Sequence, residues 1–127
     1  MKTNNKGFTL IELIMVIVIL GILAAVVVPK FFSFTTQAHN KNKQAVIGAV
    51  RSGLNLYAAS ELVNNGTRHF PASDQLQTEQ AWVDSVMDEF PDGWTAGGDG
   101  SVATLTYDAT STVYTYNSAG GGTYTLE

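Results

Sequence analysis

The sequence predicts an α+β protein with a long N-terminal α-helix, apolar and then amphipathic, and a small antiparallel β-sheet head packed on the C-terminal half of that helix. Three observations predict this fold. Residues 13–28 form an unbroken apolar run, residues 46–62 carry apolar side chains at helical spacing, and three short runs after residue 100 alternate apolar with polar residues. At 127 residues the chain has room for about one small domain.

We expect four parts along the chain, with boundaries set by changes in composition. They are a leader at 1–7, an apolar helix segment at 8–29, an amphipathic helix half at 30–65, and a head at 66–127 that holds a short helix and a three-stranded β-meander.

The apolar segment is long enough to cross a membrane. Its 21 or so residues from Phe8 span roughly 31 Å as a helix. Lys2 and Lys6 precede it, so the positive-inside rule places the N-terminus in the cytoplasm and the C-terminus outside. The sequence therefore predicts a single-pass membrane protein.

Glu12 is the one acid at the start of this apolar segment. A carboxylate at mid-helix depth costs roughly 2.5–3.5 kcal/mol on insertion scales, and intramembrane ionisable groups are usually functional. Its place near one end of the segment allows a second interpretation, in which Glu12 simply reaches the lipid headgroups.

The leader "MKTNNKG" is polar and stops at Gly7. An ordinary secretory signal has its apolar region before the cut, whereas a cut after Gly7 would remove the leader and keep the helix. The stretch "KGFTLIELIMVIVILGILAAVVVPKF" resembles the N-terminus of type IV pilins and of the related pseudopilins of type II secretion over roughly the first 30 residues.

The resemblance implies a role for each matching residue. Gly7 and Phe8 flank the site cut by a prepilin peptidase, and the new N-terminus, Phe8, is methylated. One turn of helix separates Glu12 from the Phe8 amine that cleavage would free, so a pair within one chain is open. The resemblance implies that Glu12 meets the Phe8 amine of a neighbouring subunit, so that two charges neutralise only in the correct register. A pilus assembly platform and cytoplasmic ATPases are the further partners implied, together with the membrane before assembly.

Gly21 and Pro29 are the weak points of the helix. Proline removes a backbone donor, and glycine costs about 1 kcal/mol relative to alanine. We expect the stretch between them to unwind most readily, and the resemblance implies that it melts in the filament.

The second helix half carries one apolar stripe and ends at a glycine. The stripe comprises Val46, Ile47, Val50, Leu54, Tyr57, Ala58 and Leu62, and Gly66 is expected to take the left-handed cap.

The head is expected to begin with a loop, "GTRHFPAS". A short amphipathic helix in "TEQAWVDSVMDEF", capped by Thr78, and a second loop, "PDGWTAGGDG", would follow. The strands "SVATLTY", "TVYTYN" and "TYTLE" would then turn one face inward, made of Ala103, Leu105, Tyr107, Tyr114, Tyr116, Tyr124 and Leu126. A head of 62 residues is near the lower limit for a self-sufficient core and needs the helix or neighbouring subunits.

Candidate chemical sites are few. The chain has no cysteine, which excludes disulfides and thiolate metal sites. Asp92 and Asp99 are weak calcium candidates without EF-hand spacing, so we assign no metal, and His39 and His69 are expected at the surface. We expect no cofactor and no enzyme activity, because neither a nucleophile and base pair nor a metal cluster is evident.

Charge is unevenly placed along the chain. All seven Lys and Arg residues lie at or before Arg68, and nine of the eleven acids follow it. The C-terminal half is therefore a poor candidate for gripping phosphate backbones through its own surface.

These observations favour a major structural subunit of a type IV pilus, first in the bacterial inner membrane and then in an extracellular homo-oligomeric filament. Adhesion, twitching motility, aggregation or DNA uptake are its implied uses, with the filament contacting a surface or DNA. A pseudopilin of type II secretion and a minor pilin are the alternatives. "PKFF" after the apolar run also resembles the mannose-sensitive haemagglutinin type of pilin.

A bulky residue at the leader's end tests the assigned cut. We expect Gly7→Leu to block processing, because the peptidase must accommodate that position, and the uncut precursor to accumulate on a gel of membrane fractions. Normal processing of Gly7→Leu would refute the cut site.

Overall fold

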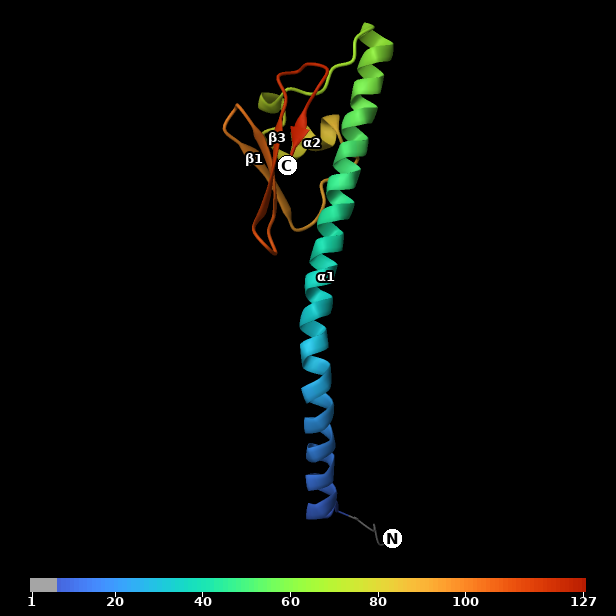
Figure 1. Ribbon diagram of the computed structural model, residues 1–127, viewed down its shortest axis with the longest axis vertical. Helices are drawn as coiled ribbons and strands as arrows, with labels where there is room; N and C mark the ends of the chain where they lie inside the picture. The colour runs from blue at the N-terminus through green and yellow to red at the C-terminus, as the bar shows by residue number, and fades with distance from the viewer. Residues whose placement is uncertain (1–6) are drawn as a thin grey trace, which may run out of the picture. The chain divides into compact units, whose positions relative to one another are not determined.

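The computed structural model describes residues 7–127 and has one long helix, two short helical segments and four strands within that range (Figure 1). In chain order the elements are α1 (Leu10–Asn65), η1 (Ser73–Gln75), α2 (Glu79–Ser85), β1 (Trp94–Gly98), β2 (Ala103–Tyr107), β3 (Thr112–Asn117) and β4 (Thr125–Leu126). The α+β class predicted from the sequence is confirmed.

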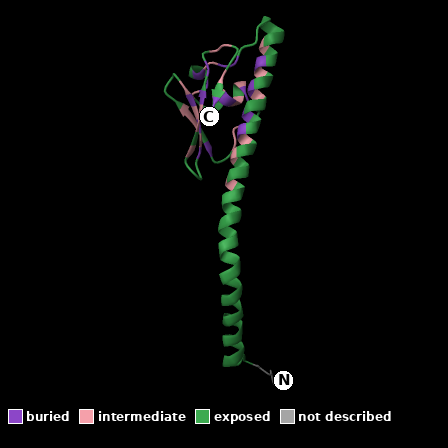
Figure 2. Cartoon of the chain, viewed as in Figure 1, coloured by how far each residue is buried: buried purple, intermediate pink, exposed green. Residues whose placement is uncertain are grey.

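Contacts divide the chain into two compact units, Met1–Ala38 and His39–Glu127, and α1 contributes to both. Within the described residues of the first unit every side chain is exposed, as the uniform green of that part of Figure 2 shows. All the buried residues belong to the second unit. The hydrophobic core of the described chain is therefore the core of the head and the helix half that it includes.

One face of α1 forms part of this core. Ile47, Val50, Leu54 and Ala58 are buried, at the spacing of three and four that keeps side chains on one side of a helix. The predicted stripe is confirmed at these positions. Leu62 differs from the expectation and is 51% exposed, because it lies in the last turn of the helix.

The end of α1 and the start of α2 follow the predicted caps. Gly66 has φ of 74° and donates its backbone N–H to Leu62 O (3.1 Å), so the left-handed cap after Asn65 is confirmed. Thr78 accepts a hydrogen bond from Ala81 N (3.3 Å) and caps α2.

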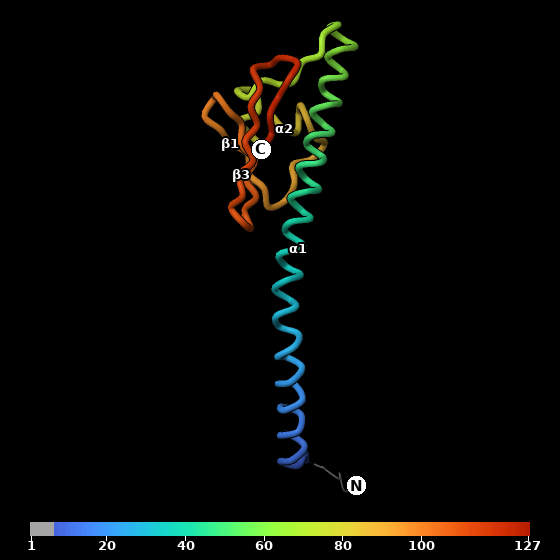
Figure 3. The backbone as a smooth tube through the Cα atoms, viewed as in Figure 1, coloured from blue at the N-terminus to red at the C-terminus, as the bar shows by residue number. Residues whose placement is uncertain are grey.

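The strands form an antiparallel meander in the order β1-β2-β3-β4. Figure 3 shows the path of the backbone through this part of the chain. Leu105 pairs with Tyr114, and Tyr116 pairs with Leu126. The inward face predicted from alternation is confirmed: five of its members are buried, and Tyr114 and Tyr124 pack against the core while partly exposed.

A fourth strand, β1, corrects the prediction of a three-stranded meander. Its sequence, "WTAGG", reads as a loop because two glycines and flanking turn residues dominate it. Trp94 nevertheless lies opposite Tyr107, is 3% exposed, and donates its Nε1–H to Asn42 Oδ1 (3.0 Å). Burial of one large aromatic and pairing with β2 outweigh the poor strand propensity of the glycines.

Polar bonds join the sheet to the helix half within the second unit. The Tyr107 hydroxyl and His39 Nδ1 lie 2.7 Å apart, and Arg51 donates to Leu126 O (3.4 Å). The contact with Tyr107 leaves His39 half-buried, whereas the sequence predicted a surface residue. The prediction was wrong because Tyr107 lies 68 positions further along the chain, beyond the reach of a local pattern. His69 is exposed as predicted and bonds Gly120 O (2.7 Å).

Gly53 marks the closest approach between α1 and the segment after α2. A Cβ built on Gly53 would lie 1.8 Å from Val86 O, whereas a Cβ on Gly48 meets nothing within 4 Å. Glycine at 53 is thus required by packing, while glycine at 48 is not.

We therefore expect Gly53→Ala to lower the free energy of unfolding of the head by about 1–3 kcal/mol, since the backbones must separate. Gly48→Ala is the matched control and should raise stability by up to about 1 kcal/mol through helix propensity. Denaturant unfolding of the detergent-solubilised full chain, followed by fluorescence of the buried Trp82 and Trp94, measures both. Equal effects of the two substitutions would contradict the close contact.

Tyr116 is the central aromatic of the sheet. It is fully buried, donates its hydroxyl to Pro71 O (2.7 Å), and meets the edge of the Trp82 ring (centroids 5.6 Å apart). Burial disfavours the phenolate and raises the pKa of Tyr116 to about 12.

This shift predicts an alkaline loss of stability. An unfolded tyrosine ionises near pH 10.0, while folded Tyr116 keeps its proton until about pH 12. The stabilisation is therefore complete below pH 10 and falls by on the order of 2–3 kcal/mol as the pH rises to 12. Unfolding curves of wild type and Tyr116→Phe measured across this range should converge, because the variant lacks the ionising hydroxyl, and parallel curves would refute the assignment.

Candidate functional site

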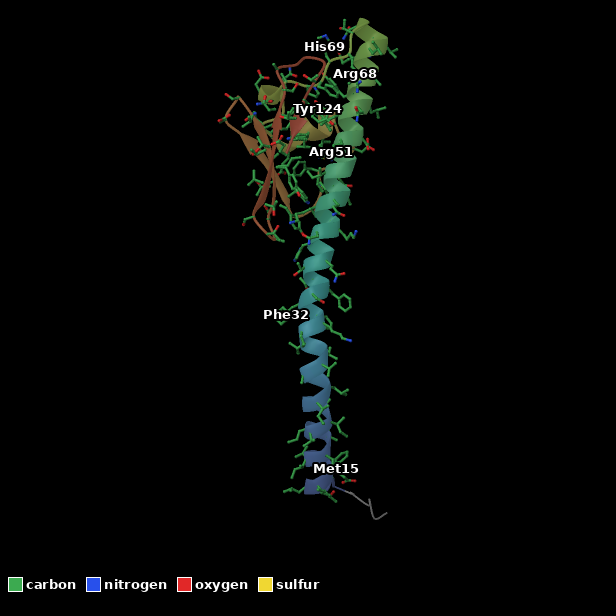
Figure 4. All side chains as sticks on the ribbon, viewed as in Figure 1. Met15, Phe32, Arg51, Arg68, His69 and Tyr124 are labelled. Carbon is green, nitrogen blue, oxygen red and sulfur yellow. The ribbon has the colours of Figure 1, made fainter. Side chains whose placement is uncertain are left out.

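The apolar half of α1 presents a surface that nothing within its own unit covers. Every residue from Leu13 to Val28 is exposed. The helix contains an 18-residue window of mean hydropathy 3.1 and is long and apolar enough, by length and composition, to cross a membrane. Figure 4 shows the labelled side chains of Met15 and Phe32 projecting outward from the helix.

The free energy gained by burying this apolar surface is large. Burying one Leu, Ile, Val or Met side chain is worth about 1.5–3 kcal/mol relative to leaving it in water. Over an apolar helix of this length the total is on the order of tens of kcal/mol, which exceeds the usual net stability of a domain. Lipid or the apolar helices of other chains are the two environments that supply such burial.

Thr9 and Glu12 form a capping box at the start of this helix. Glu12 Oε2 accepts hydrogen bonds from Thr9 N (2.7 Å) and from Thr9 Oγ1 (2.7 Å), and Glu12 N approaches Thr9 Oγ1 (3.3 Å). These bonds satisfy backbone donors that a helix N-terminus leaves free. Sequence reasoning missed Thr9, although the spacing T-x-x-E at the head of an apolar run is the signal that would have found it.

The capping geometry leaves part of the carboxylate unused. Both bonds from Thr9 reach Oε2, and within residues 7–127 no hydrogen bond to Glu12 Oε1 is present. Glu12 can therefore cap its own helix with one oxygen and accept a donor from another molecule with the other. None of the interpretations of Glu12 drawn from the sequence included this local role.

The residues of the expected cut lie in irregular backbone ahead of α1. Gly7 is exposed, and a Cβ on it meets nothing within 4 Å among the described residues, so packing within residues 7–127 does not require glycine there. Phe8 is 93% exposed. The remainder of the leader, residues 1–6, lies outside the described residues.

Gly21 and Pro29 both lie inside α1, which is helical at each position. A Cβ on Gly21 also meets nothing within 4 Å, so this glycine weakens the helix without serving a contact in its own unit. Unwinding of the stretch between the two stays a prediction for the assembled state.

The weak calcium candidates do not gather. Within residues 7–127 no cluster of three or more His, Asp or Glu side chains is placed to hold a metal ion. Asp99 Oδ1 instead accepts backbone hydrogen bonds from Ser101 N (2.9 Å) and Val102 N (3.1 Å), which hold the pKa of this carboxyl below its usual value. Asp99 thus serves the β1-β2 turn.

Comparison with known families gives a match at the N-terminus. Residues 2–28 match the prokaryotic N-terminal methylation motif. This range contains Gly7, Phe8 and Glu12.

Curated relatives include subunits of two kinds of assembly. The chain is 48% identical to the type IV narrow pilus major component PilA5 of Thermus thermophilus over 71 residues (56% of each chain). It is 45% identical to the type II secretion system core protein G of Pseudomonas aeruginosa over 56 residues (44% of this chain, 39% of the relative). With the type IV major pilin PilA of Myxococcus xanthus it shares 54% over 42 residues (33% and 18%).

The chain spans just over half of the length of PilA5 and less of the other two relatives. No solved structure matches it.

Substituting Glu12 separates capping from charge. Glutamine can keep the capping box but carries no charge, whereas alanine loses both. If charge pairing between copies is essential, Glu12→Gln and Glu12→Ala should both reach the membrane, be cut normally and fail to assemble, while Thr9→Val, which disrupts the cap alone, should assemble at a reduced level. Sheared fibre yield and membrane levels measure this, and wild-type assembly of Glu12→Gln would show that capping suffices.

Proposed function

We propose that the chain, which matches the prokaryotic N-terminal methylation motif and is similar to type IV pilins and type II secretion pseudopilins, is the major structural subunit of a type IV pilus. On this proposal the chain is made as a membrane precursor, cut after Gly7, and polymerised through its apolar helix into an extracellular filament. The filament would serve adhesion, motility or DNA uptake through contacts with surfaces or DNA, driven by an assembly platform and ATPases that act as partners of this chain.

The observation that carries the proposal is the apolar surface of residues 13–28, exposed on every side of the helix. An amphipathic surface helix would show one polar face, and this segment has none. A helix apolar all round suits lipid, and it equally suits the centre of a bundle of identical helices. The same segment therefore serves the precursor in the membrane and the subunit in the fibre.

Processing is supported by the position of Gly7, for which the part of the chain that the structure describes shows no packing role. Since a Cβ there meets nothing within 4 Å, the glycine suits an outside partner, for which we propose the prepilin peptidase. Cleavage would leave a free amine on Phe8, which is then methylated. Phe8 is 93% exposed, so its amine and ring are accessible to an enzyme and to a neighbouring copy.

Register within the fibre would come from Glu12. Its Oε2 caps the helix through Thr9, and Oε1 is free to accept the Phe8 amine of an adjacent copy. A buried charge left without its partner is strongly unfavourable, so copies stacked at the wrong axial offset are excluded. The same pair tolerates the correct offset because each charge then gains a hydrogen-bonded counter-ion.

A pseudopilin of type II secretion is the second candidate. The identity of 45% over 56 residues to a type II secretion core protein G supports it. A pseudopilin would use the same helix to build a short structure in the cell envelope. The identity of 48% over a longer stretch of 71 residues to a major pilus component favours the pilus.

Shearing fibres from cells of the native host tests the two candidates directly. Long surface fibres in which this chain is abundant and begins at methylated Phe8, by mass spectrometry, are the result we expect. Processed chain confined to the cell envelope, with a protein secretion defect on deletion, would identify a pseudopilin instead.

A further inference from the structure

A groove lies between α1 and the segment around the end of α2, within the second unit. Its volume is about 760 Å³, which is in the range of pockets that hold drug-sized molecules or several side chains. Its walls include Leu56 and Tyr57 on α1 and Val83 and Met87 on the opposite side. Leu56 is 73% exposed, so the groove presents apolar surface to the outside.

The groove has a mixed lining, in which two carboxylates and the hydroxyls of Ser52, Ser60 and Ser85 accompany the apolar side chains. Asp84 and Asp88 are both exposed and belong to its lining. Asp84 accepts a hydrogen bond from the side-chain amide of Gln80 (2.7 Å). Because that amide is neutral, the bond does not compensate the negative charge of Asp84. The groove therefore suits an occupant that is apolar in the middle and cationic at its edge.

The first unit carries a segment with this chemistry. Lys30, Phe31 and Phe34 are exposed, and they follow directly on the membrane-length apolar run. Residues three and four apart share a helix face, so Phe31 and Phe34 lie together with Lys30 beside them. Phe32, one position further round, faces another direction and is not part of this set.

We propose that the groove of one copy of the chain receives the Lys30–Phe34 face of a second copy, with Phe31 and Phe34 in the groove and Lys30 beside Asp84 and Asp88. This inference rests on the proposed polymerisation and names a contact in it. Charge complementarity argues for a second copy, since all the cations lie at or before Arg68 and most acids follow it. A head-to-stem contact between copies brings the two halves of this distribution together.

The two parts of the contact have different effects. Aromatic side chains bury large apolar areas and supply most of the free energy of such contacts. Charges at the edge add less affinity but select the partner and the register, because like charges brought together cost several kcal/mol. The contact would thus fix the position of each head on its neighbour's stem, independently of the pairing at Glu12.

Charge reversal with rescue tests the proposal in the full chain expressed in its host. The double variant Asp84→Lys/Asp88→Lys should lower sheared fibre yield by about tenfold, which is the effect of about 1.4 kcal/mol. Lys30→Glu alone should also lower it, by placing a third acid at the groove. Combining all three substitutions should restore the yield, since the charges are again opposite.

A matched control carries the same change in net charge elsewhere on the head. Asp74→Lys/Asp92→Lys reverses two exposed acids outside the groove lining and should leave fibre yield unchanged. Membrane levels of each precursor show whether it folds and inserts. A folding defect in the head cannot be repaired by Lys30→Glu, which lies in the other unit, so rescue reports a contact between copies.

Aromatic truncation gives a second reading that depends on no charge. Phe31→Ala/Phe34→Ala should lower the yield, while Phe32→Ala should not. Wild-type yield of both charge variants, failure of the triple variant to recover, or equal effects of the aromatic variants would each overturn the contact while leaving the pilus proposal intact. A wild-type chain that forms no fibres at all would overturn both.

Discussion

An apolar helix surface that its own unit leaves uncovered must be covered by lipid or by other chains. The rest of the structure depends on this requirement. Residues 13–28 are exposed on every side, and their burial is worth on the order of tens of kcal/mol. The head, by contrast, has its own core, in which α1 supplies one buried face. One helix thus joins a segment that needs external partners to a segment that stabilises a folded domain.

Glu12 illustrates how a local role and the proposed assembly role can share one side chain. Hydrogen bonds from Thr9 offset part of the free-energy cost of placing the Glu12 carboxylate in an apolar segment. The same bonds complete the capping box at the N-terminus of the helix. The oxygen that these bonds leave free is the one available to a neighbouring copy. The proposed membrane precursor would therefore keep its acid hydrogen-bonded at one oxygen before any partner arrives.

Much of the fold follows from periodicity in the sequence. The apolar run, the stripe at Val50 and Leu54, and the caps at Gly66 and Thr78 were predictable because each depends on residues close together in the chain. Strand β1 could not be predicted in this way, because its stability comes from contacts with Tyr107 and Asn42 rather than from its own glycine-rich sequence.

The same distinction applies to the sites. The Thr9–Glu12 box was present in the sequence as T-x-x-E and was overlooked, whereas the half-buried position of His39 depends on a partner 68 residues away. The groove beside Leu56 could not be predicted from any sequence pattern, because it exists only once α2 is placed against α1. The roles of Gly7, Phe8 and Glu12 in processing and assembly remain predictions from the resemblance and the geometry.

The proposed function requires the apolar segment to move from lipid into the interior of a fibre made of this chain. Since the chain has no cysteine, a single thiol introduced as Ala24→Cys can report on that segment alone, with Ser101→Cys in the exposed head as the reference. In intact sheared fibres, a water-soluble maleimide should label the head thiol and spare position 24 until detergent dissociates the fibre. Equal labelling of the two thiols in intact fibres would contradict the account.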